Sequence, residues 1–245
     1  MKITRVILSS NESREYLDFW PIVSKAWINL GIKPTLIYTG DEALTEPNVI
    51  DLNIKSINSA FVAQNVRLLA PALFPEDVCI ISDIDDMPLS KKYFQDNIKD
   101  FDDDKFIIYR PDAVPENMIS IMWNVAKGQV WSKIFDVYNL NDIKNKLISW
   151  YPNNYSVRGQ NWYFDQIILR NKINTFQEKF PSSVIELSDE LTGFNRLNRS
   201  KLKRNFRKFY IEGTDYTDFH MPRPYKKHKK LIDKVYDIHF IKNIF

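Results

Sequence analysis

The sequence predicts an α/β domain whose central sheet is mostly parallel and is flanked by helices. Two observations carry this prediction. Strand-like and helix-like segments alternate through the first 110 residues, which favours a parallel sheet covered by helices. The strand-like segment Val78–Ser82 is also largely apolar, as is typical of a strand buried in such a sheet. The 245 residues suffice for one large domain with a full core.

The first half of the chain supplies most of the predicted elements. The predicted strands are Arg5–Ser9, Lys33–Tyr38, Val78–Ser82 and Lys105–Tyr109. The predicted helices are Glu15–Leu30, in which apolar residues recur at helical spacing, and Phe61–Leu73. The first helix is expected to end at Gly31, and Pro21 within it indicates a late start or a kink.

The second half is less regular. Its predicted helices are Val130–Tyr138, Tyr163–Arg170 and a last one over Lys229–Tyr236. The segment Ser188–Tyr210 is mostly polar and basic. No linker separates the two halves, so we predict a single domain over residues 1–245.

The composition excludes several classes of site. With six glycines, the chain has almost no scope for a glycine-rich phosphate loop. Its one cysteine, Cys79, excludes an internal disulfide and a cysteine-based zinc site, and we expect Cys79 to be buried in a strand. The apolar run Val6–Leu8 is too short for a signal peptide, and no stretch approaches the ~20 apolar residues of a membrane span. We therefore expect a soluble, cytoplasmic protein.

The net charge of +3 is unevenly distributed. Residues 83–104 are acidic, whereas residues 196–208 and 223–230 are basic. This asymmetry suggests a cation site in the acidic region and an anionic partner for the basic segments. A solvated basic helix explains the basic segments equally well. The partner considered for the C-terminal basic segment is an anionic membrane surface reached by peripheral contact, and no nucleic acid is expected.

The strongest motif is a group of carboxylates, Asp83, Asp85 and Asp86, directly after the strand Val78–Ser82. Carboxylates this close repel one another and are tolerated where a cation neutralises them. In an extended segment Asp83 and Asp85 share a face, while Ile84 points to the core. Carboxylate oxygens suit Mg²⁺ or Mn²⁺. Ligands bind beyond the carboxyl ends of parallel strands, so the motif lies where a site is expected. A solvated acidic turn is the alternative.

The segment Ala63–Leu68, followed by Pro71, Leu73 and Pro75, and the motif Ile81–Asp85 together resemble the GT-A glycosyltransferases. In that superfamily a helix with an Arg-Leu pair precedes a strand that ends in Asp-x-Asp. The form Ser-Asp-Ile-Asp-x-x-Pro-Leu is especially similar to viral and bacterial enzymes that build surface glycans. The resemblance implies one GT-A, Rossmann-like domain, with a nucleotide-binding half over residues 1–110 and an acceptor and donor-sugar half over residues 111–245.

The function implied by the resemblance is metal-dependent transfer of a hexosyl or deoxyhexosyl group. The donor is a nucleotide-diphosphate sugar, with a UDP-sugar favoured, and the acceptor is a glycan or another lipid-linked or protein-linked hydroxyl. Asp83 and Asp85 would bind Mn²⁺ or Mg²⁺ that bridges to the diphosphate, and Asp83 would also face the donor. Asp86 would be a further ligand or a supporting residue. Arg67 would contact the donor or pair with the acidic cluster.

A polar loop follows the first strand, at Ser9, Ser10 and Asn11. In GT-A proteins this loop holds the base and ribose of the nucleotide, and small polar side chains can hydrogen-bond the edge of a base. An ordinary polar loop is the alternative. Downstream, Gly128 in the predicted donor-sugar and acceptor wall is expected to allow a close approach of the backbone.

Asp165 and Gln166 begin an apolar helix, and glycogenin-like GT-A enzymes carry a similar Asp-Gln pair near the donor sugar. We therefore predict both as catalytic residues. Asp165 would hold sugar hydroxyls or act as the general base for the acceptor hydroxyl, and the Gln166 amide would lie near the reacting carbon. The alternative is that Asp165 only stabilises a helix N-terminus through its charge.

A second polar group contains Asp218, His220 and Arg223. Many metal-dependent GT-A enzymes complete the metal site with a C-terminal histidine, and imidazole is an acceptable ligand of Mn²⁺. We predict His220 as the third metal ligand, with Asp218 or a backbone carbonyl group on its other ring nitrogen, and Arg223 on the diphosphate. His239, which also follows an acidic residue, is the rival ligand. The longer C-terminal motif of the glycogenin-like enzymes is absent.

Two other functions remain open at the level of sequence. The first is metal-dependent phosphoryl transfer or phosphoester hydrolysis by the same carboxylates, although phosphatases of the haloacid type place their Asp-x-Asp on the first strand. The second is a non-catalytic module whose basic segment binds nucleic acid or an anionic surface. That function leaves the carboxylates after a buried strand unexplained.

Overall fold

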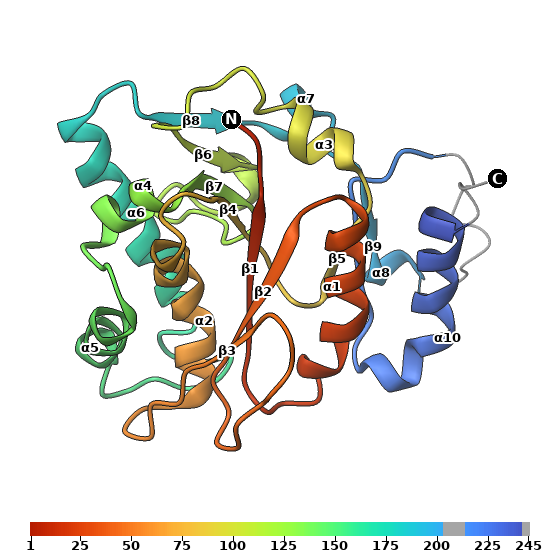
Figure 1. Ribbon diagram of the computed structural model, residues 1–245, viewed down its shortest axis with the longest axis horizontal. Coiled ribbons are helices and arrows are strands. Elements are labelled where there is room, and N and C mark those ends of the chain that lie inside the picture. Colours follow the sequence, from red (N-terminus) through yellow and green to blue (C-terminus); the bar gives the residue numbers. More distant parts are fainter. Residues whose placement is uncertain (203–213, 242–245) are drawn as a thin grey trace.

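The computed structural model describes residues 1–202 and 214–241 and is built around a seven-stranded sheet (Figure 1). The strand order is β3-β2-β1-β4-β7-β6-β8. The strands are β1 (Arg5–Ser10), β2 (Lys33–Tyr38), β3 (Val49–Asp51), β4 (Val78–Ile81), β6 (Phe106–Tyr109), β7 (Asn124–Lys127) and β8 (Val184–Leu187). The sequence predicted β1, β2, β4 and β6 within one residue at each end, and the prediction of an α/β fold with a mostly parallel sheet is confirmed.

Parallel pairing dominates the sheet and aligns the ends of its strands. β1 lies between β2 and β4 and is parallel to both, and β3 and β8 also pair in parallel with their neighbours. β7 is the exception, because it runs antiparallel between β4 and β6. The carboxyl ends of β1 and β4 therefore meet at one edge of the sheet, where a parallel sheet presents its ligand site.

Helices cover both faces of the sheet (Figure 1). The longer ones are α1 (Trp20–Asn29), α2 (Ser59–Leu69), α4 (Gly128–Phe135), α5 (Leu140–Trp150), α6 (Phe164–Lys179) and α10 (Tyr225–Tyr236). The shorter ones are α3 (Lys91–Asp96), α7 (Asp189–Thr192), α8 (Arg199–Leu202), the 3₁₀ segments η1 (Leu17–Phe19), η2 (Ala70–Leu73) and η3 (Pro111–Ala113), and the π turn η4 (Asp237–Ile241). Among the described residues, no helix combines the length and the hydropathy of a membrane span.

The strands divide their side chains between two cores. On β1, Val6 and Leu8 belong to the core shared with α1, α3 and α10, whereas Ile7 belongs to the core shared with α2, α4, α5 and α6. Successive residues of a strand face opposite sides, so a strand covered on both faces carries apolar residues in succession, as Val6–Leu8 do. Cys79 of β4 lies in the second core and is fully buried, as predicted.

Several helix boundaries differ from the prediction for local reasons. The predicted helix Glu15–Leu30 begins later, because Pro21 occupies its first turn and a short 3₁₀ segment precedes it. The predicted helix Phe61–Leu73 changes at Ala70 into a 3₁₀ segment that contains a proline. The last helix starts before Lys229, directly after Pro224.

A second, three-stranded sheet has the order β5-β10-β9 and was not predicted. Its strands are β5 (Asp86–Pro88), β9 (Arg196–Asn198) and β10 (Asp218–His220). β10 runs antiparallel to β5, with His220 opposite Asp86 and Asp218 opposite Pro88. β9 lies parallel on the other side of β10. This small sheet attaches the C-terminal part of the chain to the residues that follow β4.

The close backbone approach at Gly128, predicted for a donor-sugar and acceptor wall, is instead made to the turn that precedes β4, where Gly128 begins α4. A β-carbon at this position would lie 2.7 Å from the carbonyl oxygen of Pro71 and closer still to that of Phe74. Backbone atoms cannot move aside as a flexible side chain can. The contact between α4 and η2 therefore requires a residue without a side chain.

We predict that Gly128→Ala lowers the free energy of unfolding by about 1–3 kcal/mol, the usual cost of overpacking. Gly193→Asn is the matched control, because Gly193 has a φ of 66° and a β-carbon there would meet no atom within 4 Å. Asparagine tolerates this left-handed conformation. Urea unfolding of both variants measures the difference, and equal stabilities would contradict the packing argument.

Candidate active site

A cavity of about 530 Å³ opens at the carboxyl ends of β1 and β4. It is bounded by the loop after β1, one side of α2, the turn after β4, the start of α6 and the small sheet. All ten residues predicted for the site line this cavity: Ser9, Ser10, Asn11, Arg67, Asp83, Asp85, Asp165, Gln166, His220 and Arg223. The structure thus brings together residues that lie more than 200 positions apart in the sequence.

Arg67 of α2 bridges two carboxylates of the cavity. Its guanidinium pairs with Asp83 and lies 3.5 Å from Asp165 at the start of α6. The alternative sequence interpretation of Arg67, a salt bridge to the acidic cluster, is therefore the arrangement seen. Burial would lower the pKa of Arg67, but the charges of Asp83 and Asp165 raise it above its ordinary value, so the guanidinium stays charged.

Asp165 is buried at the start of α6, where it was expected. Burial raises its pKa to about 7, although Arg67 and the backbone N–H of Gln166 favour the ionised form. Its side chain accepts a hydrogen bond of 2.9 Å from that N–H. The helix-capping alternative and a functional role are therefore compatible. A carboxyl group with a pKa near neutrality is suited to proton transfer.

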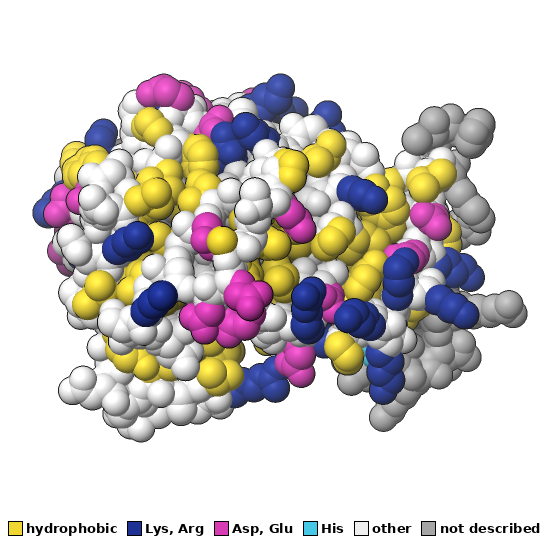
Figure 2. All heavy atoms as spheres, turned by 60° about the horizontal axis from the view of Figure 1, so that its bottom comes forward, with side chains coloured by type: hydrophobic (Ala, Val, Ile, Leu, Met, Phe, Trp, Pro, Cys, Tyr) yellow, Lys and Arg dark blue, Asp and Glu magenta, His cyan; other side chains and the backbone are white. Residues whose placement is uncertain are grey.

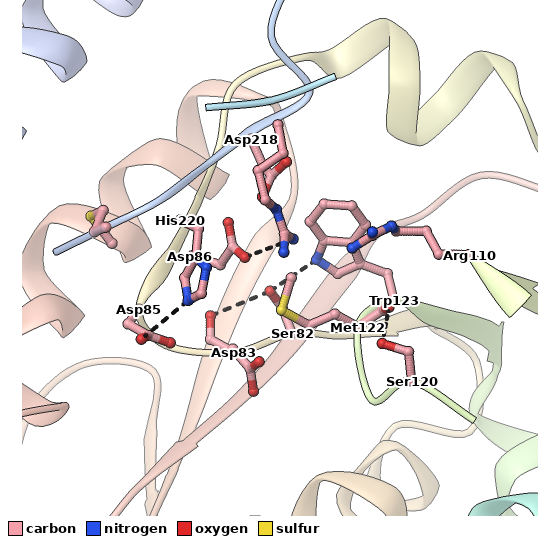
Figure 3. Close-up of polar contacts among 12 residues, drawn as sticks. Ser82, Asp83, Asp85, Asp86, Arg110, Ser120, Met122, Trp123, Asp218 and His220 are labelled. Carbon is pink, nitrogen blue, oxygen red and sulfur yellow. Dashed lines mark hydrogen bonds and ion pairs between the residues drawn. The ribbon is translucent and has the colours of Figure 1, made fainter. Parts of the chain in front are cut away.

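Asp85 is surrounded by three basic side chains from the second half of the chain. Its Oδ2 atom lies 2.9 Å from Arg199 Nη1, 3.4 Å from Arg223 Nε and 3.7 Å from His220 Nε2. Figure 3 shows the side chains of Asp85 and His220 pointing toward one another. Burial opposes ionisation, but hydrogen bonding to His220 and the charges of His220, Arg223 and Arg199 hold the pKa of Asp85 below its ordinary value.

Only two of the three predicted metal ligands lie side by side. Asp85 and His220 share one side of the turn, whereas the Asp83 carboxylate is held by Arg67. Within residues 1–202 and 214–241, no three acidic, histidine or cysteine side chains converge as a metal-binding group. A carboxylate oxygen beside an imidazole nitrogen is nevertheless a donor pair that Mn²⁺ accepts. Asp85 and His220 therefore fit the ion, whereas Asp83 is paired with Arg67.

Asp86 does not belong to the cavity lining, so the structure does not support it as a further metal ligand. It is fully buried, and its Oδ2 atom accepts a hydrogen bond of 2.9 Å from Arg196, which also donates to Asp218 at 2.7 Å. Burial and the nearby Asp218 raise the pKa of Asp86 well above its ordinary value. Asp218 pairs with Arg196, and the structure gives it no hydrogen bond to His220, where it was one of two predicted supports.

The loop after β1 has an ordered set of polar contacts. The Ser9 hydroxyl donates to the carbonyl oxygen of Ala63 at 2.5 Å, and the Asn11 amide donates to the Ser59 hydroxyl at 3.2 Å. These bonds fix the loop against the first turns of α2. Tyr16, which the sequence did not single out, stands beside this loop, and its hydroxyl accepts a hydrogen bond from Arg223.

Sequence analysis missed Arg196 and Arg199 as residues of the site. Both lie in the basic segment 196–208, where they were interpreted as solvated side chains or as contacts of an anionic partner. Their guanidinium groups instead turn inward to the acidic turn after β4. The rest of that segment from residue 203 lies outside the described residues. Only the charge of the arginines was visible in the sequence, not the carboxylates that they contact.

Arg110 is another cavity residue without a sequence signal. It follows β6 with a φ of 58° and pairs with Asp189 at 2.9 Å, while its guanidinium stacks on Phe194 at 3.8 Å. Left-handed backbone at a bulky residue is uncommon and often marks a functional site. His239 lies in the π turn outside the cavity lining and packs against Phe240.

Comparison with known proteins identifies the fold but no sequence relative. No protein-family model and no curated protein matches the chain. The glycosyltransferase GlyE of Streptococcus pneumoniae TIGR4 superposes with a TM-score of 0.50 at 13% identity, over 98% of this chain and 61% of that one. The galactosyltransferase LgtC superposes with a TM-score of 0.47 at 8% identity, over 94% of this chain and 96% of that one.

A glycosyltransferase involved in glycosylation of the major capsid of PBCV-1 gives a TM-score of 0.48 at 10% identity, over 93% of this chain and 99% of that one. The GlyE superposition and the sheet topology show that the chain has a GT-A glycosyltransferase fold. The resemblance noted in the sequence is confirmed for the fold.

We predict a pH-dependent stability that originates in Asp165. Because its pKa is raised from 3.8 to about 7, the folded protein holds a proton that the unfolded chain releases between these pH values. Stability therefore falls as the pH rises from about 4 to 7. Asp165→Asn removes this loss and should stabilise the protein more at pH 8 than at pH 5, by on the order of 1 kcal/mol per pKa unit.

Thermal unfolding without metal or nucleotide at the two pH values measures this effect. Asp112→Asn removes an exposed carboxylate and is the control. This substitution should change the stability of the protein by the same amount at pH 5 and at pH 8. The same stabilisation by Asp165→Asn at both pH values would show that Asp165 is ionised in the folded protein throughout.

Proposed function

We propose that this protein is a metal-dependent glycosyltransferase that uses a nucleotide-diphosphate sugar, with a UDP-sugar favoured. The observation that supports this function is the convergence of Asp83, Asp85, Asp165 and His220 with five arginines in one cavity beyond β1 and β4. Carboxylates beside an imidazole suit a divalent cation, and guanidinium groups suit phosphate oxygens. Both features in one cavity match a diphosphate held by a metal ion.

The nucleoside would bind where β1 ends. Ser10, Asn11 and Tyr16 line this part of the cavity together with Ala60 and Ala63 of α2. The alanines leave space beside the loop, and the polar side chains offer donors and acceptors to a base or a ribose. The fixed position of the loop against α2 means that this part of the site is formed before the donor arrives.

The diphosphate would lie across the turn after β4. Asp85 and His220 would hold Mn²⁺ or Mg²⁺, with Asp83 as the further ligand, and the bound ion would supply charge stabilisation to the leaving diphosphate. Arg223 is held beside Asp85 by Tyr16, whose ring lies 4.8 Å from its guanidinium carbon. From this position Arg223 can also donate to a phosphate oxygen, so that the negative charge that develops on the leaving group is met by fixed donors.

The sugar would lie toward α6, beside Asp165 and Gln166. The Gln166 Oε1 atom is buried and has no hydrogen-bond partner among the described residues, so it is available to a donor hydroxyl of a ligand. Asp165 would accept a hydrogen bond from a sugar hydroxyl or take the proton of the acceptor hydroxyl. The acceptor is proposed to be a glycan or a lipid-linked or protein-linked hydroxyl.

Basic side chains of α10 gather on one side of the face shown in Figure 2. Lys226 and Lys229 are exposed on this helix, while Ile232 and Val235 are buried against the core. Contact of this helix with an anionic membrane surface stays a prediction, as does a cytoplasmic location.

We predict that Asp85→Asn weakens UDP binding in the presence of Mn²⁺ by at least about tenfold, since substitution of residues that merely support a metal ligand already has effects of this size. In EDTA the variant should bind UDP no more weakly than the wild type, because the arginines lose a competing carboxylate. Calorimetric titration under both conditions makes the comparison. Equal affinities of wild type and variant in Mn²⁺ would exclude Asp85 as a ligand.

We predict that His220→Ala also weakens UDP binding in Mn²⁺, because it removes the nitrogen donor beside Asp85. His239→Ala is the matched control, since His239 lies in the π turn outside the cavity lining. Donor binding and transfer from UDP-sugars to glycan acceptors should fall in the first variant alone. If His239→Ala were the damaging substitution, the rival ligand would be the correct one.

A further inference from the structure

The Oδ2 atom of Asp85 contacts more basic groups than one carboxylate oxygen needs. Arg199, Arg223 and His220 all approach this atom, at 2.9, 3.4 and 3.7 Å. A metal ion bound by Asp85 would need a lone pair of the same carboxylate. Because like charges repel strongly at such distances, an ion bound by Asp85 favours withdrawal of the basic group that is held least firmly.

The three nearby arginines differ in how firmly they are held. Arg196 is bound between two buried carboxylates, those of Asp86 and Asp218. Arg223 is held by the ring and the hydroxyl group of Tyr16 in addition to Asp85. Both have partners that remain when a metal ion binds, so neither needs to leave its place.

Within residues 1–202 and 214–241, Arg199 has no such second anchor. Among the described residues, its polar contacts are the Asp85 carboxylate at 2.9 Å and the carbonyl oxygen of Met221 at 3.4 Å. Its side chain is 25% exposed and lines the cavity. Of these three arginines, Arg199 is thus the one whose principal partner is the Asp85 carboxylate that a metal ion would bind.

We propose that Arg199 couples metal binding to diphosphate binding by exchanging partners. Without ligands it neutralises Asp85, and when the metal ion takes that carboxylate the guanidinium moves to the phosphate oxygens of the nucleotide. This inference rests on the proposed function and adds a specific role to a residue outside the predicted metal set. Arg199 would thus oppose the binding of a metal ion without nucleotide. It would favour the binding of a metal ion together with nucleotide.

The exchange has a thermodynamic signature. A metal ion that binds alone must separate Arg199 from Asp85 and leave a guanidinium without a counter-charge beside a divalent cation. When the diphosphate is present, the guanidinium regains a charge-assisted bond. Metal and nucleotide should therefore strengthen one another's binding. By thermodynamic linkage, nucleotide raises the affinity for the metal by the same factor as the metal raises the affinity for nucleotide.

The test is a binding cycle with Mn²⁺ and UDP on the whole protein. Free Mn²⁺ is measured by electron paramagnetic resonance with and without UDP, and UDP binding is measured by calorimetry with and without Mn²⁺. In Arg199→Gln, Mn²⁺ alone should bind about fivefold more tightly, because a competing charge is gone. UDP in saturating Mn²⁺ should bind about tenfold more weakly, and the coupling factor should fall about tenfold in both titrations.

Arg14→Gln is the control for loss of a positive charge, since Arg14 is exposed and pairs with Asp18 at 3.1 Å outside the cavity. It should leave all four affinities unchanged. A wild-type protein whose UDP affinity does not depend on Mn²⁺ would overturn the proposed function, and the exchange with it. If the wild type shows the coupling but Arg199→Gln leaves it intact, or if Arg14→Gln reduces it equally, the exchange alone is overturned.

Discussion

The carboxylates that follow β4 can be buried because arginines from the other half of the chain reach them. Asp85 and Asp86 have side-chain exposures of 8% and 1%, and each is paired with a guanidinium. A charge removed from water without a partner is strongly destabilising, and loss of one partner of a buried pair typically costs about 3–5 kcal/mol. The turn after β4 and the small sheet therefore stabilise one another through these pairs.

This dependence explains why the site is assembled from both halves of the chain. The first half builds the parallel strands that bring β1 and β4 to the same edge. The second half returns through β9 and β10, and the pairing of β10 with β5 places His220 opposite Asp86. Arg196 fixes the pairing from the side, because it binds a carboxylate on each of the two strands. The backbone register and the ion pairs thus specify the same arrangement.

The sequence predicted the parts of this structure that follow from local patterns. β4 is apolar over its length and β1 and β2 each contain a continuous apolar run, because both faces of the sheet are covered, and α1 and α2 carry their apolar residues at helical spacing. Strands of three residues, such as β5, β9 and β10, are too short for any period to be detected. β7 contains only two apolar residues in Asn124–Lys127, and its antiparallel direction depends on its neighbours in the sheet.

The same distinction applies to the site. Asp83 and Asp85 were predicted from their spacing after a buried strand, whereas Asp165, Gln166 and His220 were predicted from the resemblance to GT-A enzymes, and all five line the cavity. Arg196 and Arg199 were not found, because an arginine in a basic segment has the same local sequence whether it is solvated or paired with a buried carboxylate. Arg196 contacts Asp86 across 110 positions of the chain, and no local pattern reports contacts of that length.

The balance of charge in the cavity finally favours a ligand that carries its own negative charge. Asp83 and Asp165 share Arg67, and Asp85 faces two arginines and a histidine. A divalent cation alone would add positive charge to a cavity in which each of these carboxylates already has a basic partner. A diphosphate alone would face carboxylates at short range. On the proposed function, the ion and the diphosphate together would satisfy both sets of groups, because the ion would take the place of Arg199 on Asp85 and the phosphates would receive the Arg199 guanidinium. Under the proposed function, the geometry around Asp85 would therefore suit a metal–nucleotide pair better than either component alone.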